Sequence, residues 1–156
     1  MRRVRPARPV LTNFRRILPK LLRRYFRKAR ALAADSQATS QQLHGFRIRT
    51  KRIRYVTELY AEIFERELRG ALAQFRGIQQ TLGAHQDQSM IAAYFEGRLK
   101  KIKSAAFKKE YRRLLERSRQ RQESLRKGFF QRWRRLERSG FEQGLLRRIK
   151  VAGARQ

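Results

Sequence analysis

The chain has 156 residues, of which 41 are Lys or Arg and 12 are Asp or Glu, so its formal charge is +29. This length suits one domain, and the absence of cysteine excludes a disulfide framework, a thiol nucleophile and thiolate metal sites. Hydrophobic residues make up 40% of the chain and recur at helical spacing, which argues against a disordered basic tail. We therefore expect a folded, cytoplasmic protein with an anionic partner.

The first part of the chain contains a basic arm and one long helix. Two prolines disfavour helix in residues 1–10, and helical spacing of apolar residues then runs from 11 to 34. Pro19 lies inside this helix and should kink or divide it. The helix is rich in arginine and no acid precedes Asp35, as in a mitochondrial targeting segment, but its long apolar face favours a permanent member of a bundle. No apolar run is long enough to span a membrane.

Further helices follow a polar linker at 35–41. They are expected at about 42–64, 67–82, 86–102 and 105–137. Gly83 should cap the C-terminus of the third helix. In the second helix the buried face is expected to carry Phe46, Ile53, Val56, Tyr60 and Ile63. In the last helix it should carry Phe107, Tyr111, Leu114, Leu125, Phe129 and Leu136. The sequence predicts an all-α antiparallel bundle of about four to five amphipathic helices over residues 11–149, followed by a C-terminal tail at 150–156.

Cations also recur at helical spacing, in two rows. The first-helix row is Arg16, Lys20, Arg23, Arg27 and Arg30. The second-helix row is His44, Arg47, Lys51 and Arg54, bordered by Tyr55 and nearly opposite the apolar side. Such rows match a linear polyanion through charge-assisted hydrogen bonds. Solvated surface is the alternative, but cations that serve solubility are usually interspersed with acids, and the first helix has none.

The remaining ionisable residues give weaker signals. Glu58 and Glu62 lie one turn apart, so a metal site completed by His44 is one interpretation. Intrahelical ion pairs of Glu58 with Arg54 and of Glu62 with Arg66 are the simpler one. Asp87 falls at the expected start of a helix, where the helix dipole stabilises a carboxylate, and the role of His85 stays open. The sequence contains no phosphate-binding glycine loop, paired catalytic carboxylates or nucleophile with a base. Neither catalysis nor a cofactor is expected.

Two motifs resemble a known family. The run from Leu43 to Tyr55 (LHGFRIRTKRIRY), followed by Glu58-Leu59, resembles the signature helix of the CHAD family, the conserved histidine α-helical domains. The run from Ile78 to Asp87 (IQQTLGAHQD) is similar to that family's Leu-Gly turn closed by an Asp. Together the motifs cover about residues 43–90.

The resemblance implies an all-helical fold that binds inorganic polyphosphate on a basic surface, without cofactor or turnover, in association with polyphosphate granules. The implied ligand contacts are His44, Arg47, Lys51, Arg52 and Arg54. Tyr55 and Glu58 would support this row, and Asp87 would be a structural or orienting residue. We expect Arg16, Lys20, Arg23 and Arg27 of the first helix to extend the binding surface.

Members of that family usually carry two related bundles, each with its own histidine helix, whereas this chain has one such helix. Either two copies pair to rebuild the binding channel, or the chain is a divergent fragment with an open groove. Pairing about a two-fold axis is the simplest solution, although the like charges of two copies repel unless a ligand bridges them.

Three other functions compete with polyphosphate binding. Nonspecific nucleic-acid binding fits the charge equally well, but the aromatic residues fall on apolar faces and no base-reading motif occurs. A polyphosphate hydrolase or kinase accessory would use Glu58 and Glu62 to hold a divalent ion. The basic first helix is also compatible with an anionic membrane surface.

Overall fold

The computed structural model describes residues 10–35 and 37–154, and the surroundings of side chains for 12–35 and 37–152. Its five helices are α1 (Val10–Ala34), α2 (Ser40–Ala61), α3 (Glu65–Leu99), α4 (Ala105–Arg138) and α5 (Phe141–Ala154). No strand occurs in the described ranges. The predicted all-α fold of four to five helices is thereby confirmed. The expected basic arm lies outside the described residues, apart from Val10, where α1 already begins.

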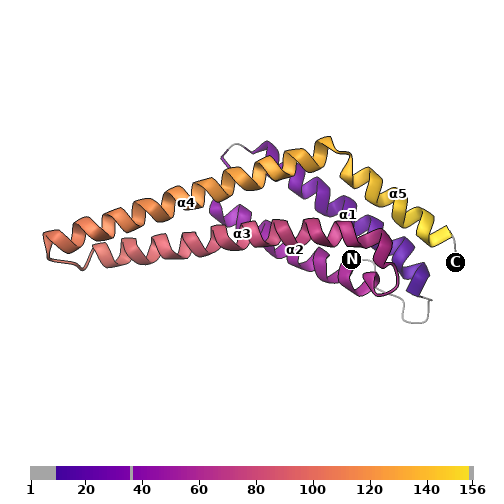
Figure 1. Cartoon of the computed structure of the whole chain (residues 1–156), viewed down its shortest axis with the longest axis horizontal. Coiled ribbons are helices and arrows are strands. Elements are labelled where there is room, and N and C mark those ends of the chain that lie inside the picture. The colour runs from indigo at the N-terminus through magenta and orange to yellow at the C-terminus, as the bar shows by residue number, and fades with distance from the viewer. Residues whose placement is uncertain (1–9, 36, 155–156) are drawn as a thin grey trace.

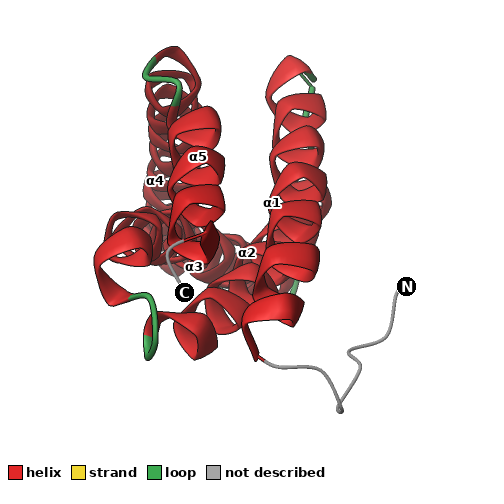
Figure 2. Ribbon diagram, turned by 90° about the vertical axis from the view of Figure 1, so that its right-hand side faces the viewer, coloured by secondary structure: helices red, strands yellow, loops and turns green. Residues whose placement is uncertain are grey.

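The two longest helices form an antiparallel hairpin on which the others pack. In Figure 1, α3 and α4 run side by side, and α1, α2 and α5 gather around the half of the hairpin that holds the start of α3 and the end of α4. The other half, with the loop between α3 and α4, extends beyond them. Viewed from the end, α1 stands opposite α4 and α5, with α2 and α3 at the base (Figure 2).

Aromatic side chains fill the centre of the bundle. The Trp133 ring of α4 is fully buried and lies 5.6 Å from the Phe26 ring of α1 and 6.1 Å from the Phe46 ring of α2, measured between centroids. Tyr25 stacks on Phe46 at 5.1 Å, and its hydroxyl forms a 3.2 Å hydrogen bond with the buried Thr50 hydroxyl. These contacts join three helices and set which side of α2 faces inward.

Two turns are fixed by local chemistry. A capping box starts α2: the Thr39 hydroxyl accepts a hydrogen bond from the Gln42 N–H at 3.2 Å, and the Gln42 side-chain oxygen accepts from the Thr39 N–H at 2.6 Å. Between α4 and α5 the backbone turns at Gly140, whose φ of 64° is in the left-handed region that glycine tolerates best. The chain can therefore reverse there and add α5 to the bundle.

The structure corrects the prediction that Gly83 ends a helix. α3 runs without interruption from Glu65 to Leu99, so the expected third and fourth helices are one. An interior glycine costs a helix about 1 kcal/mol, and packing along both α2 and α4 outweighs this cost. Asp87 consequently lies in the middle of α3, and the predicted role for it at a helix N-terminus is wrong.

Two further features of the helices differ from expectation. α1 continues through Pro19 as one helix and is not divided there, although Pro19 cannot donate to the carbonyl of Arg15. The C-terminal residues expected to form a tail are helical as far as Ala154, as part of α5.

The burial pattern is confirmed close to the centre of the bundle and fails away from it. Phe46, Ile53, Tyr60, Phe129 and Leu136 are buried, as expected, and Val56, Tyr111 and Leu125 are half-buried. By contrast, Phe107 is 66% exposed, Leu114 39% and Ile63 51%. Phe107 and Leu114 lie on the part of the hairpin that extends beyond the other helices, and Ile63 lies in the turn after α2. Helical spacing identifies an apolar face but not whether a second helix covers it.

A glycine allows α3 and α4 to approach closely. The guanidinium of Arg132 in α4 occupies the space that a Cβ atom on Gly77 of α3 would fill. From this position Arg132 donates a 3.0 Å hydrogen bond to the Gln74 side-chain oxygen. The contact places a charged group over bare backbone between the two longest helices.

His85 lies in the core of the hairpin and not on a functional surface. Its side chain is 2% exposed. Burial lowers its pKa below the usual value of 6.5, the positive charge of Arg126 lowers it further, and Glu123 acts in the opposite direction. The imidazole therefore packs in its neutral form at neutral pH.

Ile53 and Ile63 offer a matched test of the core. Ile53→Ala should lower the free energy of unfolding by about 2–5 kcal/mol, because it leaves a cavity. Ile63→Ala, at an exposed position, should change it by less than about 1 kcal/mol. Urea denaturation followed by circular dichroism measures both values, and equal losses would contradict the observed packing of α2.

The buried His85 should make stability depend on pH. Since its pKa is lower in the folded than in the unfolded state, acid favours the unfolded state, which takes up the proton more readily. The free energy of unfolding should thus fall as the pH drops below about 6.5. His85→Gln should reduce this fall, as measured by denaturation at pH 7.5 and 5. The same fall in His85→Gln as in the unmodified chain would show that His85 is not its source.

Candidate functional site

The second-helix row lies along the contact between α2 and α3. The two helices are antiparallel neighbours joined by a short turn, so residues at similar distances from that turn meet. The inward position of Phe46, Ile53 and Tyr60 directs His44, Arg47 and Arg54 to the side of α2, where all three are partly buried. The row therefore borders α3.

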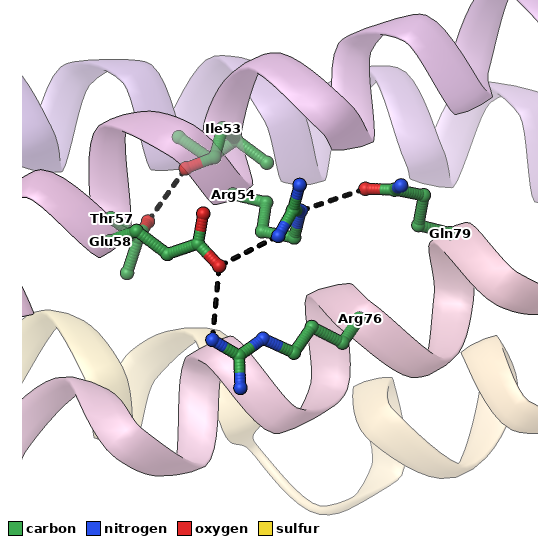
Figure 3. A network of polar contacts seen from close by, with 6 residues as sticks. All are labelled: Ile53, Arg54, Thr57, Glu58, Arg76 and Gln79. Carbon is green, nitrogen blue, oxygen red and sulfur yellow. Dashed lines mark hydrogen bonds and ion pairs between the residues drawn. The ribbon is translucent and has the colours of Figure 1, made fainter.

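A hydrogen-bonded network joins the end of this row to α3 (Figure 3). Arg54 donates from Nε to the Gln79 side-chain oxygen at 2.9 Å and from Nη1 to Glu58 Oε1 at 2.7 Å. The same oxygen of Glu58 accepts from Arg76 Nη2 at 3.0 Å. One carboxylate thus holds two guanidinium groups from different helices close together. The expected ion pair between Arg54 and Glu58 is confirmed.

Toward the start of α2, two polar atoms of the row are buried and have no hydrogen-bond partner among the described residues. Within the described residues, neither Arg47 Nε nor His44 Nδ1 has a hydrogen-bond partner. Arg47 lies against Gly83 of α3, with its Nε 3.7 Å from where a Cβ atom on that glycine would stand. A buried donor without a partner costs about 1–3 kcal/mol. Both positions therefore have unused capacity for hydrogen bonding to a ligand.

Lys51, Arg52 and Tyr55 form the solvent-facing part of the site. All three are exposed. The Tyr55 ring contacts two cations of the row, with its centroid 4.5 Å from Arg54 Cζ and 5.6 Å from Lys51 Nζ. Arg52 points about 100° away from Lys51 around the helix axis, so it flanks the row rather than extending it.

The first-helix row borders a different neighbour. Arg30 forms a 2.5 Å ion pair with Glu142 of α5. Arg23 lines a groove between α1 and α5 whose opposite side holds Arg147 and Lys150. Lys20 and Arg27 are exposed and Arg16 is half-buried. Arg23 and Arg30 of the first-helix row therefore border α5, whereas Arg47 and Arg54 of the second-helix row border α3.

The other acidic residues do not gather into a metal site. The described residues hold no cluster of three or more His, Asp or Glu side chains that could bind a metal ion. Glu62 is exposed and forms no ion pair with Arg66 in the described chain, unlike the pair expected from their spacing. Asp87 is exposed on α3, beyond Gly83.

Sequence reasoning missed Arg76 and Gln79, which α3 contributes to the site. Their signal is the turn near Phe64: folding α2 and α3 back on each other there places Arg76 opposite Glu58 and Gln79 opposite Arg54. The expected break at Gly83 hid this pairing, because it left the third helix too short to align with the whole of α2.

Chemically, the site presents cations from two helices with one carboxylate between them. It can accept an anion with several oxygens arranged along a line, since guanidinium groups bind such oxygens through paired hydrogen bonds. No helix in the described part of the chain combines the length and apolar character needed to cross a membrane.

Comparison with known proteins agrees with the motifs in α2 and α3. Searches of curated proteins and of solved structures gave no match. A family model, that of the CHAD domain, matches residues 2–96, which is more than half of the chain. The matched region contains the whole of α2 and the part of α3 that borders it, and the chain therefore belongs to the CHAD domain family.

Proposed function

We propose that this protein binds inorganic polyphosphate at the α2–α3 row without turning it over. The row comprises His44, Arg47, Lys51, Arg54 and Arg76. The observation that carries the proposal is the pair of buried polar atoms, Arg47 Nε and His44 Nδ1, which lack a partner in the described residues. Beside them stand the exposed Lys51 and the guanidinium groups held by Glu58. A polyphosphate chain would supply an oxygen to each group in succession, because its phosphates repeat along a line.

Membership of the CHAD domain family supports this ligand, since that domain is associated with polyphosphate binding. The formal charge of +29 supports a polyanion of some kind. Cytoplasmic location at polyphosphate granules is part of the proposal, as is the flanking role of Arg52. Tyr55 would hold Lys51 and Arg54 in place through its ring.

The first-helix cations have a separate place in this proposal. Arg23 lines the groove with α5, Lys20 and Arg27 are exposed, and Arg16 is half-buried. They would contact another stretch of a long polymer and not the segment held at the row. Pairing of two copies, expected because the chain has one histidine helix, would likewise lengthen the stretch of polymer that is held.

Nonspecific binding of nucleic acid is the competing function. DNA and RNA also present phosphates in a row, so charge does not separate the two ligands. What favours polyphosphate is that the described residues of α2 offer bases little to stack on: Tyr55 is their exposed aromatic residue, and its ring already contacts two cations. A site with one occupied ring offers little to bases, which bind single strands mainly by stacking.

The decisive measurement is competition between long-chain polyphosphate, duplex DNA and single-stranded RNA at matched phosphate concentration and two salt concentrations. We expect polyphosphate to be preferred. The double variant Arg47→Ala/Lys51→Ala should bind it about tenfold or more weakly, since it loses two charge-assisted contacts.

The matched control is Lys109→Ala/Arg112→Ala, which removes one exposed Lys and one exposed Arg from α4. It should retain most of the affinity. Equal losses in the two double variants would indicate a diffuse electrostatic surface. Equal competition by all three polymers would favour nonspecific polyanion binding and shift the proposal toward nucleic acid.

A substitution at Glu58 distinguishes polyphosphate binding from hydrolysis. Glu58→Gln removes the charge that occupies Arg54 and Arg76, so polyphosphate should bind about twofold to fivefold more tightly. Glu62→Gln removes the same charge one turn along, at a residue with no ion pair in the described chain, and should have a smaller effect. Titration of labelled polyphosphate measures the affinities. Release of phosphate by the purified chain, abolished in Glu58→Gln, would instead establish hydrolysis.

A further inference from the structure

The part of the hairpin that extends beyond the bundle has contacts of its own. We call it the distal arm: residues 85–99 of α3 and 105–122 of α4 (Figure 1). Between its two helices the Phe95 and Tyr111 rings meet edge to face at 5.6 Å, and Ser118 Oγ bonds to the Gln88 carbonyl at 3.0 Å. Glu96 pairs with Arg119 at 2.6 Å. The arm is therefore held together on the side where α3 faces α4.

The opposite side of α3 is exposed and apolar. Its residues recur at helical spacing and form what we call the distal stripe: Asp87, Met90, Ile91, Tyr94 and Arg98. Met90 is 64% exposed, Tyr94 59% and Ile91 40%. Nearer the bundle, this side of α3 is covered by α2, through contacts such as that of Arg47 with Gly83. The stripe is the continuation of a helix-packing surface beyond the end of α2.

All residues of the stripe except Arg98 lie in the longest run of the sequence without Lys or Arg. Although 41 of the 156 residues are Lys or Arg, none occurs from residue 77 to 97. A polyanion has no reason to bind there. A second molecule with the same large positive charge, by contrast, can approach this surface without bringing cations into contact.

The order of residues along the stripe makes it complementary to itself. An acid, Asp87, stands at one end, a base, Arg98, at the other, and apolar side chains lie between them. If two stripes pack antiparallel about a two-fold axis near residues 92 and 93, each Asp87 lies opposite the second copy's Arg98, and each Ile91 opposite its Tyr94. Within the described chain, neither Asp87 nor Arg98 forms an ion pair, whereas Glu96 does. The two charges are available to a second copy.

We propose that two copies of this chain associate through their distal arms, with the α3 stripe of one against the α3 stripe of the other. The two hairpins then form a four-helix layer that buries Met90, Ile91 and Tyr94 and leaves both cationic rows outside. This names a surface for the pairing of copies and does not require polyphosphate to be bound.

The mass of the full chain in solution tests the interface, with no polyanion present and in about 0.3 M NaCl to screen repulsion. Sedimentation equilibrium should give twice the 18.7 kDa of one chain. Ile91→Glu should weaken the dimer by tenfold or more, because it buries a charge. Val151→Glu, which adds the same charge at an exposed apolar position of α5, should leave the dimer intact.

A charge exchange tests the two-fold arrangement. Asp87→Arg and Arg98→Asp should each weaken the dimer, because like charges then meet, and the double variant should recover it. This recovery also shows that neither change simply unfolds the chain. A monomer at every concentration up to about 0.1 mM, a dimer that survives Ile91→Glu, or a double variant weaker than both single ones would overturn the proposal. If the chain is a monomer yet binds polyphosphate, only the interface fails.

Discussion

Packing of the Trp133 ring against aromatic rings of α1 and α2 is the contact on which the other features depend. The chain has to bring together α1, α2 and α4, which each carry a large excess of cations, and their mutual repulsion opposes the bundle. Apolar burial at the centre offsets this, and large rings contribute most per residue. Tyr25 also fixes which side of α2 faces inward, because its hydroxyl forms a hydrogen bond with the Thr50 hydroxyl. The Thr50 hydroxyl in turn donates to the Phe46 carbonyl at 3.0 Å. The same burial raises the pKa of Tyr25, which keeps its hydroxyl protonated.

The rotation of α2 about its axis follows from that core, and the site follows from the rotation. With Phe46 and Ile53 inward, Arg47 and Arg54 must lie beside α3, where burial removes water from their guanidinium groups. Arg54 recovers hydrogen bonds from Glu58 and Gln79, whereas Arg47 Nε does not within the described residues. Arg54 thus stabilises the helix pair, whereas Arg47 keeps a donor that the proposed anion would use.

Most of the fold could be predicted from the sequence, because helical spacing and turn residues act locally. The ends of α1 and α4 and the second-helix row are of this kind. The predictions that were wrong concern features that depend on contacts between residues distant in sequence. Gly83 reads as a helix end in isolation, yet contacts with α2 and α4 carry α3 through it. Phe107 has the spacing of a core residue, but no other helix of the described chain reaches that part of the hairpin. The contributions of Arg76 and Gln79 required the pairing of α2 with α3, which no single segment reveals.

The contact between Gly77 and Arg132 has a consequence for how this sequence can vary. Any side chain at position 77 would occupy the space of the Arg132 guanidinium, so the flexible end of this arginine would have to shift, which would disturb its hydrogen bond to Gln74. A shorter residue at position 132 would remove the conflict but leave Gln74 without this donor. Positions 74, 77 and 132 are therefore coupled. In related sequences, a side chain at position 77 should be tolerated best when residue 132 changes with it.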